Sequence, residues 1–375
     1  MRALGRPRRA VADVRAGPRS RCQHYVAYDG PVAGPRTTVV VTCCNGEKFL
    51  GEQLRSIASQ TQLPDEVVVG DDASTDGSVD IAREVLDGLA ADVQVLTSRS
   101  RLGLTANLAR CLERSTGEIV HFADHDDVWR PGKVARVSEA FAANPRAELV
   151  FSDGEVVDSN GSPTGRTLWS FVGFGAADRH QWAERPVGVL CRRTVVTGAA
   201  MAARRGLVEA ALPLPDNCWH DEWFALCAVL RDTVPVALPD RLIAYRVHGS
   251  NLAGLPPRRA RDRLVQAGWP RDTRVECWTE ACERFSRGQA SEQLRAAVAF
   301  ARRRPGRSTP PMERCGRVAW LSLAGDYRRY GKGWPMALHD LVAPALYGRS
   351  GRHWPKLTTP APAVGAGASS FGERP

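Results

Sequence analysis

The sequence predicts an α/β fold built on a mostly parallel central sheet with flanking helices. Short runs of β-branched residues that end in polar residues alternate with helical segments of about 10 to 15 residues. This alternation is typical of βαβ units, in which a helix carries the chain back to a parallel neighbouring strand. The pattern holds from about residue 37 to residue 158 and gives way after residue 254 to Arg- and Ala-rich helical segments.

The elements follow one another in a regular order. The run TTVVVTCCN is rich in β-branched residues and predicts the first strand, and the next segment repeats apolar residues at the helical spacing of Phe49, Leu50, Leu54 and Ile57. By the same two criteria we expect strands over 37–45, 65–74, 93–98, 118–124 and 147–158, and helices over 46–61, 78–90, 105–115, 132–145 and 221–230.

Composition and charge divide the chain into segments. Residues 1–36 carry a net charge of +6, residues 37–254 carry −8 and residues 255–375 carry +12. We expect a flexible basic N-terminal tail over 1–36, an acidic folded domain over 37–254, a basic helical C-terminal region over 255–350 and a disordered tail over 351–375. An acidic centre with basic ends argues against a nucleic-acid-binding surface and suits a carboxylate site beside segments that can touch anionic lipid. A high Arg content without any partner is the alternative.

The cysteines and the apolar runs indicate the compartment. Cys43 and Cys44 are adjacent, and no two of the ten cysteines form a CxxC pair, so we expect reduced thiols and a cytoplasmic protein. The sequence has no apolar run of about 18 to 20 residues, and its N-terminus lacks the apolar core of a secretory signal.

Three polar clusters stand where predicted strands end. They are TCCNGE after the first strand, DDASTDGS after the second and DHDD after the fourth. Ligands of open parallel sheets bind beyond the carboxyl ends of the strands, so these clusters predict one binding site. DDASTDGS is also compatible with a turn and a helix cap made by Ser74 or Asp76.

The DHDD cluster suits a metal ion. Asp124, Asp126 and Asp127 lie close together after an apolar strand, where their mutual repulsion calls for a positive charge. Dense oxygen ligands are typical of Mg²⁺ or Mn²⁺, which commonly bridge to the phosphates of a substrate. A solvated acidic loop is the alternative.

Six segments, in order, resemble the family 2 glycosyltransferases of the GT-A fold, and specifically their bacterial rhamnosyltransferase-like group. They cover Val39 to about Asn251 and read VVVTCCNGEKFLGEQLRSIASQT, PDEVVVGDDASTDGS, RLGLTANLARCLERSTGEIVHFADHDDVW, LVFSDGEVVDSNG, HDEWFALCAV and LIAYRVHGSN. The resemblance implies a nucleotide-binding half over 37–130 and an acceptor half over 131–254.

The resemblance also implies a role for each matching residue. Asp221 matches the catalytic base, and the alternative is that it only caps the N-terminus of a helix. Asp124 and Asp126 match the DxD motif, and His248 matches a position near the metal and diphosphate, although an isolated histidine is more often structural. The implied nucleotide-binding residues are Thr42, Asn45, Glu47, Asp71, Asp72, Arg101 and Asp124, and the implied metal ligands are Asp124, Asp126 and His248.

A few positions depart from the family pattern. His125 replaces a glutamine and is expected to point away from the metal. Arg101 stands where an asparagine is common, and Cys43 and Cys44 replace a more polar pair. None of these changes removes a catalytic group.

The resemblance implies an inverting, metal-dependent glycosyltransferase that transfers a hexose or rhamnose from a nucleotide-sugar. The expected donor is dTDP-rhamnose or a UDP-hexose, and the expected acceptor is a glycan or a lipid-linked molecule. A polyprenyl-phosphate sugar synthase and a degenerate nucleotide-sugar-binding scaffold are the alternatives. A nucleotidyltransferase would need a Gly-rich phosphate loop, and a glycoside hydrolase would leave the metal cluster unexplained. The segment 327–349 mixes basic, aromatic and apolar residues, which predicts either peripheral contact with the inner face of an anionic membrane or a helical lid.

Overall fold

The computed structural model describes residues 34–249, 272–305 and 309–347. From Pro35 onward the chain forms one compact unit. The tails predicted over 1–36 and 351–375 fall outside the described residues, apart from 34–36. The boundaries predicted at residues 130 and 254 stay predictions.

A nine-stranded sheet forms the centre of the described structure. Its strand order is β3-β2-β1-β4-β8-β6-β9-β5, and β7 pairs with β6. The pairings place β5, β7 and β8 antiparallel to their neighbours, so the other six strands all run in one direction. The strands are β1 (Thr37–Cys43), β2 (Glu66–Asp71), β3 (Asp92–Thr97), β4 (Ile119–Asp124), β5 (Val128–Trp129), β6 (Leu149–Val157), β7 (Pro163–Thr167), β8 (Met201–Arg204) and β9 (Val236–Arg246).

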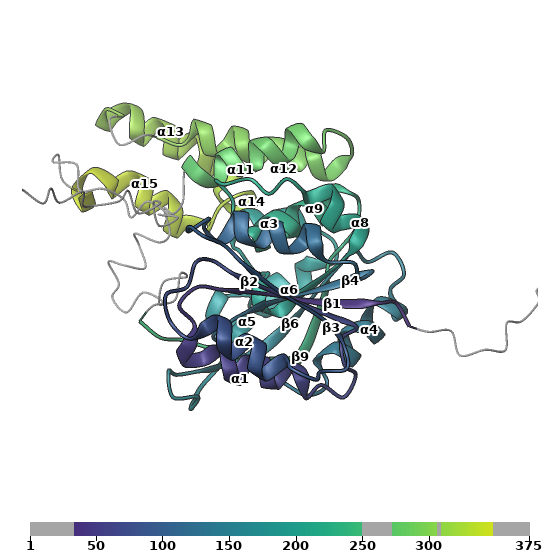
Figure 1. The fold of residues 1–375 in the computed structure, drawn as a ribbon. Coiled ribbons are helices and arrows are strands. Elements are labelled where there is room, and N and C mark those ends of the chain that lie inside the picture. Colours follow the sequence, from purple (N-terminus) through teal and green to yellow (C-terminus); the bar gives the residue numbers. More distant parts are fainter. Residues whose placement is uncertain (1–33, 250–271, 306–308, 348–375) are drawn as a thin grey trace, which may run out of the picture. The chain divides into compact units, whose positions relative to one another are not determined.

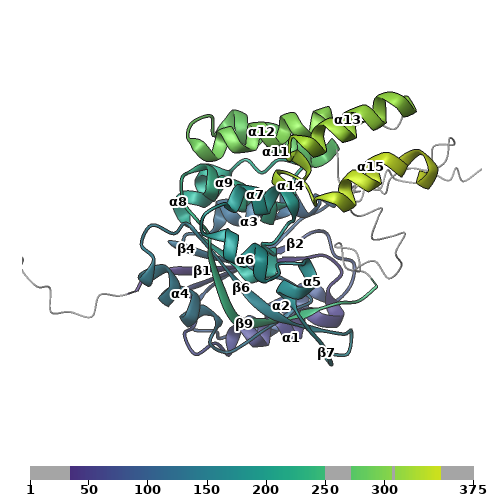
Figure 2. The ribbon, with the colours of Figure 1, turned by 180° about the vertical axis from the view of Figure 1, so that it is seen from behind.

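Helices cover both faces of the sheet. Figures 1 and 2 show α1 and α2 on one face and α3, α8 and α9 on the other, with α11 to α13 lying beyond that second layer. The helices are α1 (Glu47–Ala58), α2 (Ser78–Leu86), α3 (Leu104–Arg114), α4 (Lys133–Ala143), α5 (Leu168–Val172), α6 (Ala176–Trp182), α7 (Pro186–Arg192), α8 (Arg205–Ala211), α9 (His220–Leu230), α11 (Asp272–Arg284), α12 (Gln289–Arg303), α13 (Pro311–Leu323), α14 (Asp326–Arg329) and α15 (Trp334–Tyr347), with a 3₁₀ turn, η1, at Gly198–Ala200.

The central strand β1 shows why the apolar run in the sequence is continuous. All seven of its residues are buried. Val39 and Val41 belong to the core beneath α1 and α2, whereas Val40 belongs to the core beneath α3, α8 and α9. Alternate side chains of a strand face opposite sides, so a strand covered on both faces needs apolar residues at every position.

The C-terminal helices α12 to α15 share a small apolar core and one buried ion pair. Phe300, Val318, Leu321, Tyr327 and Met336 form the core. Asp340, 2% exposed, accepts hydrogen bonds from Nε and Nη2 of Arg304 at 2.7 and 2.6 Å and from the Tyr327 hydroxyl at 2.7 Å. Burial raises the pKa of Asp340, but hydrogen bonds from His339, Arg304 and Tyr327 and the charge of Arg304 hold it well below its usual range.

The expected fold class and most expected elements are confirmed, with two corrections. The helix expected over 78–90 ends at Leu86, and β5, β7 and β8 had no strand signal of their own. The expectation of reduced thiols is wrong for one pair, since Cys218 and Cys277 form a disulfide. Their separation of 59 residues leaves no spacing pattern to read. Within the described ranges, no helix is both long and apolar enough to cross a membrane.

Candidate active site

The polar clusters that follow β1, β2 and β4 meet at one edge of the sheet. In the strand register Thr42 of β1 lies opposite Gly70 of β2 on one side and Asp124 of β4 on the other, and Cys43 lies opposite Asp71. Because these three strands are parallel, their carboxyl ends point the same way. Thr42, Asp71 and Asp124, which are far apart in the sequence, are therefore neighbours.

Asn45 and Glu47 connect the loop after β1 to the loop after β2. The Asn45 amide oxygen accepts a hydrogen bond from the backbone N–H of Thr75 at 2.9 Å, and Oε2 of Glu47 accepts one from Gly77 at 3.1 Å. In return, Oδ2 of Asp76 accepts a hydrogen bond from the backbone N–H of Glu47 at 3.1 Å. These side chains therefore set the shape of the loop.

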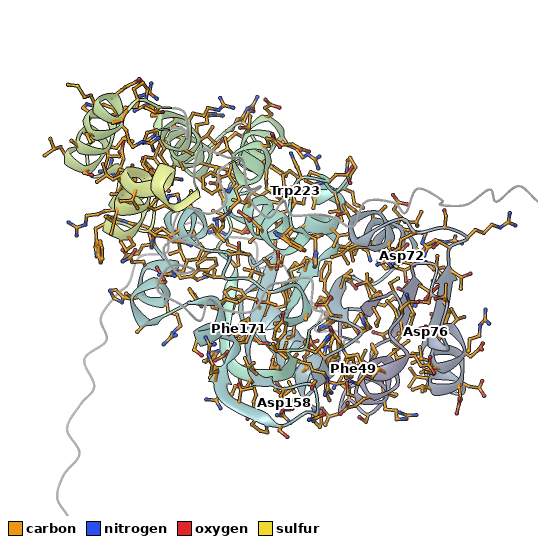
Figure 3. All side chains as sticks on the ribbon, turned by 90° about the vertical axis from the view of Figure 1, so that its left-hand side faces the viewer. Phe49, Asp72, Asp76, Asp158, Phe171 and Trp223 are labelled. Carbon is orange, nitrogen blue, oxygen red and sulfur yellow. A yellow bond between two sulfur atoms is a disulfide. The ribbon has the colours of Figure 1, made fainter. Side chains whose placement is uncertain are left out.

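The two adjacent acids at the end of β2 have different environments. The carboxylate oxygens of Asp72 accept hydrogen bonds from the backbone N–H groups of Leu102 and Gly103 at 2.6 and 3.0 Å, and Nε of Arg101 lies 3.7 Å from Oδ2 of Asp72. Figure 3 labels Asp72 and Asp76 in this part of the chain. Asp71 accepts one hydrogen bond through Oδ2, whereas its Oδ1 is buried and has no protein partner. The open acceptor therefore belongs to Asp71, and Asp72 holds the loop that carries Arg101.

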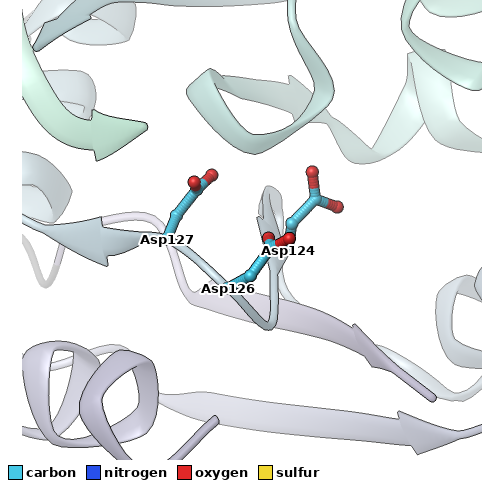
Figure 4. A group of neighbouring side chains, drawn as sticks. All are labelled: Asp124, Asp126 and Asp127. Atoms are coloured by element: carbon cyan, nitrogen blue, oxygen red, sulfur yellow. The ribbon is translucent and has the colours of Figure 1, made fainter. Parts of the chain in front are cut away.

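The three aspartates of DHDD form a compact group. Asp124, Asp126 and Asp127 each offer a carboxylate oxygen, and these atoms all lie within 4.8 Å of one another. Figure 4 shows the three side chains, with Asp124 at the end of β4 and Asp126 and Asp127 just after it. His125, between them, packs against the loop after β1, where a Cβ on Gly46 would lie only 2.6 Å from Cδ2 of the histidine.

Lys133, at the start of α4, lies beside this group. Its side chain is completely buried, and Nζ donates a hydrogen bond to the Ala199 carbonyl at 2.8 Å and lies 3.6 Å from the ring centroid of Trp129. Burial lowers the pKa of Lys133 well below its usual range, although the charges of Asp127 and Asp124 oppose the shift. The sequence analysis placed Lys133 only in a helix, and nothing in the WRPGK stretch indicates that this lysine is buried.

The end of β9 and the residues just after it supply an arginine and a histidine. The backbone N–H of Arg246 donates to Oδ1 of Asp127, its Nε donates to the Asp126 carbonyl, both at 2.8 Å, and its Nη2 pairs with Glu52 at 2.7 Å. Nε2 of His248 lies 2.9 Å from Oδ2 of Asp126. The structure thus brings His248 to the aspartate group, and it pairs Arg246 with an acid.

Burial and mutual repulsion raise the pKa values of two aspartates in this group. Burial, followed by the charges of Asp126 and Asp221, raises the pKa of Asp124 to about 7. Burial and the charges of Asp126 and Asp124 raise the pKa of Asp127 well above its usual range. Oδ2 of Asp127 is also buried without a protein partner. Close oxygen ligands, an unpartnered carboxylate oxygen and an adjacent imidazole fit a divalent cation such as Mg²⁺ or Mn²⁺.

Asp221 lies near this group and comes from α9, one of the helices that cover the sheet face opposite α1 and α2. It lies in the first turn of α9, which begins at His220 with Trp219 as the N-cap residue, so Asp221 is not the cap itself. Its Oδ1 accepts a hydrogen bond from the backbone N–H of Glu222 at 2.7 Å. Burial raises the pKa of Asp221 to about 7, even though backbone hydrogen bonds oppose the shift. A carboxyl with this pKa exchanges a proton readily near neutral pH.

Tyr245 of β9 is a further residue near both acidic groups. Its pKa is raised by burial and by the charges of Asp127, Asp124, Asp126 and Asp221. The phenol is therefore neutral and can donate a hydrogen bond at this site. The sequence analysis quoted this tyrosine without giving it a role.

The comparisons with known proteins identify the class. Residues 38–194 match Glycosyl transferase family 2, so this part of the chain belongs to that family. Together with the sheet topology, the match confirms the predicted GT-A fold.

Several similar chains are named as glycosyltransferases. One is a glycosyltransferase of Nostoc sp. described as uncharacterized, 22% identical over 58% of this chain and 66% of its own length. Another is the dTDP-rhamnosyl transferase RfbG of Shigella flexneri, which is 26% identical over 56% of this chain and 72% of its own length. The mannosyltransferase PcManGT from Pyrobaculum calidifontis was solved with GDP-Man and Mn²⁺. It is 22% identical, the match covers 84% of this chain and 88% of that one, and the TM-score is 0.48. The chain spans 45% to 66% of the length of the first three relatives that it matches.

The contrast between Asp71 and Asp72 gives a test of the site geometry. We expect Asp72→Asn to lower the free energy of unfolding by about 1 to 3 kcal/mol, because an amide nitrogen cannot accept a backbone N–H. Asp71→Asn, its matched control, should change that free energy by less than about 1 kcal/mol, because Oδ1 has no protein partner to lose. Urea unfolding of both variants without nucleotide measures this, and equal losses would contradict the assignment.

Proposed function

We propose that the chain is an inverting, metal-dependent glycosyltransferase that moves a sugar from a nucleotide-sugar donor to an acceptor hydroxyl. The observation that carries the proposal is the meeting of two acidic groups at one sheet edge. Asp221 is close enough to the metal-fitting aspartates for its charge to raise the pKa of Asp124. A base on one side of the reacting carbon and a diphosphate site on the other are what a direct displacement needs.

Each residue has a distinct task in this reaction. Asp221 accepts the proton of the acceptor hydroxyl as its oxygen bonds to the anomeric carbon. The bond from that carbon to the diphosphate breaks, and its electron pair leaves with the diphosphate oxygen. Asp124, Asp126 and His248 would hold the divalent cation, which neutralises charge on the leaving diphosphate. One displacement inverts the anomeric configuration.

The donor would lie along the ends of β1, β2 and β4. The unpartnered Oδ1 of Asp71 suits a donor group of the base or ribose, and Thr42 and the loop of Asn45 and Glu47 line the same edge. Arg101, held by the Asp72 loop, is placed to contact phosphate. The similarity to a dTDP-rhamnosyl transferase favours dTDP-rhamnose, and a UDP-hexose is the second donor to test.

The first prediction concerns metal-dependent nucleotide binding. We expect UDP or dTDP to raise the melting temperature only when Mn²⁺ or Mg²⁺ is present, because the cation joins the aspartates to the diphosphate. A ligand at about 100 times its Kd adds roughly 2.7 kcal/mol to the free energy of unfolding. Asp126→Asn should abolish this shift.

Glu139→Gln is the control, because Glu139 lies on the exposed side of α4 and should leave the shift unchanged. A metal-dependent shift without sugar transfer to any acceptor would favour a nucleotide-sugar-binding scaffold. Transfer to polyprenyl phosphate would favour a polyprenyl-phosphate sugar synthase.

The second prediction concerns the base. We expect Asp221→Asn to lower kcat by about 10² to 10⁴-fold, because the amide cannot accept a proton, while the donor Kd stays within about threefold. Only the ionised carboxylate acts as a base, and its pKa is raised to about 7, so kcat of the wild type should rise as the pH increases through that value. A pH profile of transfer by the two proteins measures both effects, and a variant with near-normal kcat would contradict the assignment.

Contact with an anionic membrane is proposed for the C-terminal helices. Met312, Trp320 and Leu323 of α13 are 90%, 54% and 89% exposed, and Trp334 of α15 is 75% exposed. Exposed arginines lie nearby, Arg317 on α13 and Arg328 and Arg329 on α14. Exposed apolar and aromatic residues among cations suit the interface of a bilayer with anionic headgroups. A cytoplasmic protein bound there would reach lipid-linked acceptors.

Vesicle co-sedimentation tests this contact. We expect the protein to bind vesicles that contain phosphatidylglycerol more tightly than pure phosphatidylcholine. The double variant Met312→Glu/Leu323→Glu should weaken binding about tenfold or more, because it removes apolar contact and adds repulsion. Leu63→Glu, an exposed leucine before β2, is the control. No binding, or equal weakening by the control, would contradict the proposal.

A further inference from the structure

Glu222, the residue after the proposed base, is buried and held by groups from elsewhere in the chain. It is 2% exposed. Its Oε1 accepts hydrogen bonds from Nε of Arg274 at 2.7 Å and from the indole N–H of Trp278 at 3.0 Å. The Thr194 hydroxyl lies 3.4 Å from Oε2. The two strongest donors both come from α11, which follows the catalytic domain in the sequence.

The same residue also holds the base. The backbone N–H of Glu222 donates to Oδ1 of Asp221 at 2.7 Å. Successive residues of an α-helix project about 100° apart, so fixing the Glu222 side chain fixes the rotation of the first turn of α9. That rotation decides where the Asp221 carboxylate points.

One face of α11 makes all of these contacts. Arg274, Cys277 and Trp278 are spaced i, i+3 and i+4, which places them side by side on a helix. Cys277 forms the disulfide with Cys218, just ahead of α9, and Nη2 of Arg274 donates to the Leu190 carbonyl at 2.7 Å. The segment that carries the base is thus attached to α11 on both sides of Asp221.

We propose that α11 is a positioning element for the reaction, acting through Arg274 and Trp278 on Glu222 to aim Asp221 at the acceptor hydroxyl. This inference rests on the proposed function. A buried ion pair adds little stability over a well-packed apolar pair, so orientation explains the Arg274–Glu222 pair better than stability does. The helix α11 then takes part in positioning the base, although none of its described residues belongs to the acidic site.

The test separates orientation from stability. Glu222→Gln/Arg274→Met removes both charges together and leaves no unpaired buried charge, and Trp278→Phe removes only the indole donor. We expect both variants to keep the donor Kd within about threefold, and the double variant to lower kcat about 10 to 100-fold, since a small misplacement of a reacting group has effects of this size. Arg274→Lys should restore part of the kcat lost in Arg274→Met.

The matched control is Arg304→Met/Asp340→Asn, which removes an equally buried ion pair from the C-terminal helices far from Asp221 in the sequence. It should lower the melting temperature but leave kcat unchanged at a temperature where all variants are folded by circular dichroism. If the Glu222, Arg274 and Trp278 variants lower kcat no more than this control, the inference is overturned. If the wild type transfers no sugar and Asp221→Asn behaves like it, the proposed function itself has failed.

Discussion

The repulsion among four neighbouring carboxylates is the constraint on which the rest of this structure depends. Asp124, Asp126 and Asp127 follow one strand, and Asp221 approaches from α9. Buried acids so close to one another resist ionisation, and the pKa values of Asp124 and Asp221 are both raised to about 7. Such a group persists in a folded protein only when the chain places cations and hydrogen-bond donors around it.

The chain meets this constraint with residues from distant elements. Lys133 lies completely buried at the start of α4, and Arg246 and His248 come from the end of β9. The backbone of Arg246 donates to Asp127, so the same contact that offsets charge also joins β9 to the loop after β4. These groups reduce the repulsion without filling the site, since one oxygen of Asp127 keeps no protein partner.

The acidic site also explains why helices outside the family 2 segment are attached so firmly. The match to that family ends at residue 194, before the proposed base Asp221 and before α11. Asp221 must nevertheless keep a fixed orientation relative to aspartates that begin about 100 residues earlier. A disulfide and a buried ion pair connect α11 to the start of α9 and to the segment just ahead of it, whereas the pair Arg304–Asp340 lies within the C-terminal helices.

The sequence by itself determined the alternating strands and helices, the parallel half of the sheet and the acidic clusters at the strand ends, because periodicity and strand direction are local properties. The same reasoning brought Thr42, Asp71 and Asp124 to one edge. Only the tertiary structure decided which of Asp71 and Asp72 has a free acceptor, that Lys133 is buried beside the aspartates, and that Cys218 pairs with Cys277. Burial, hydrogen-bond partners and disulfides depend on contacts between residues distant in the chain, and no local pattern in the sequence records them.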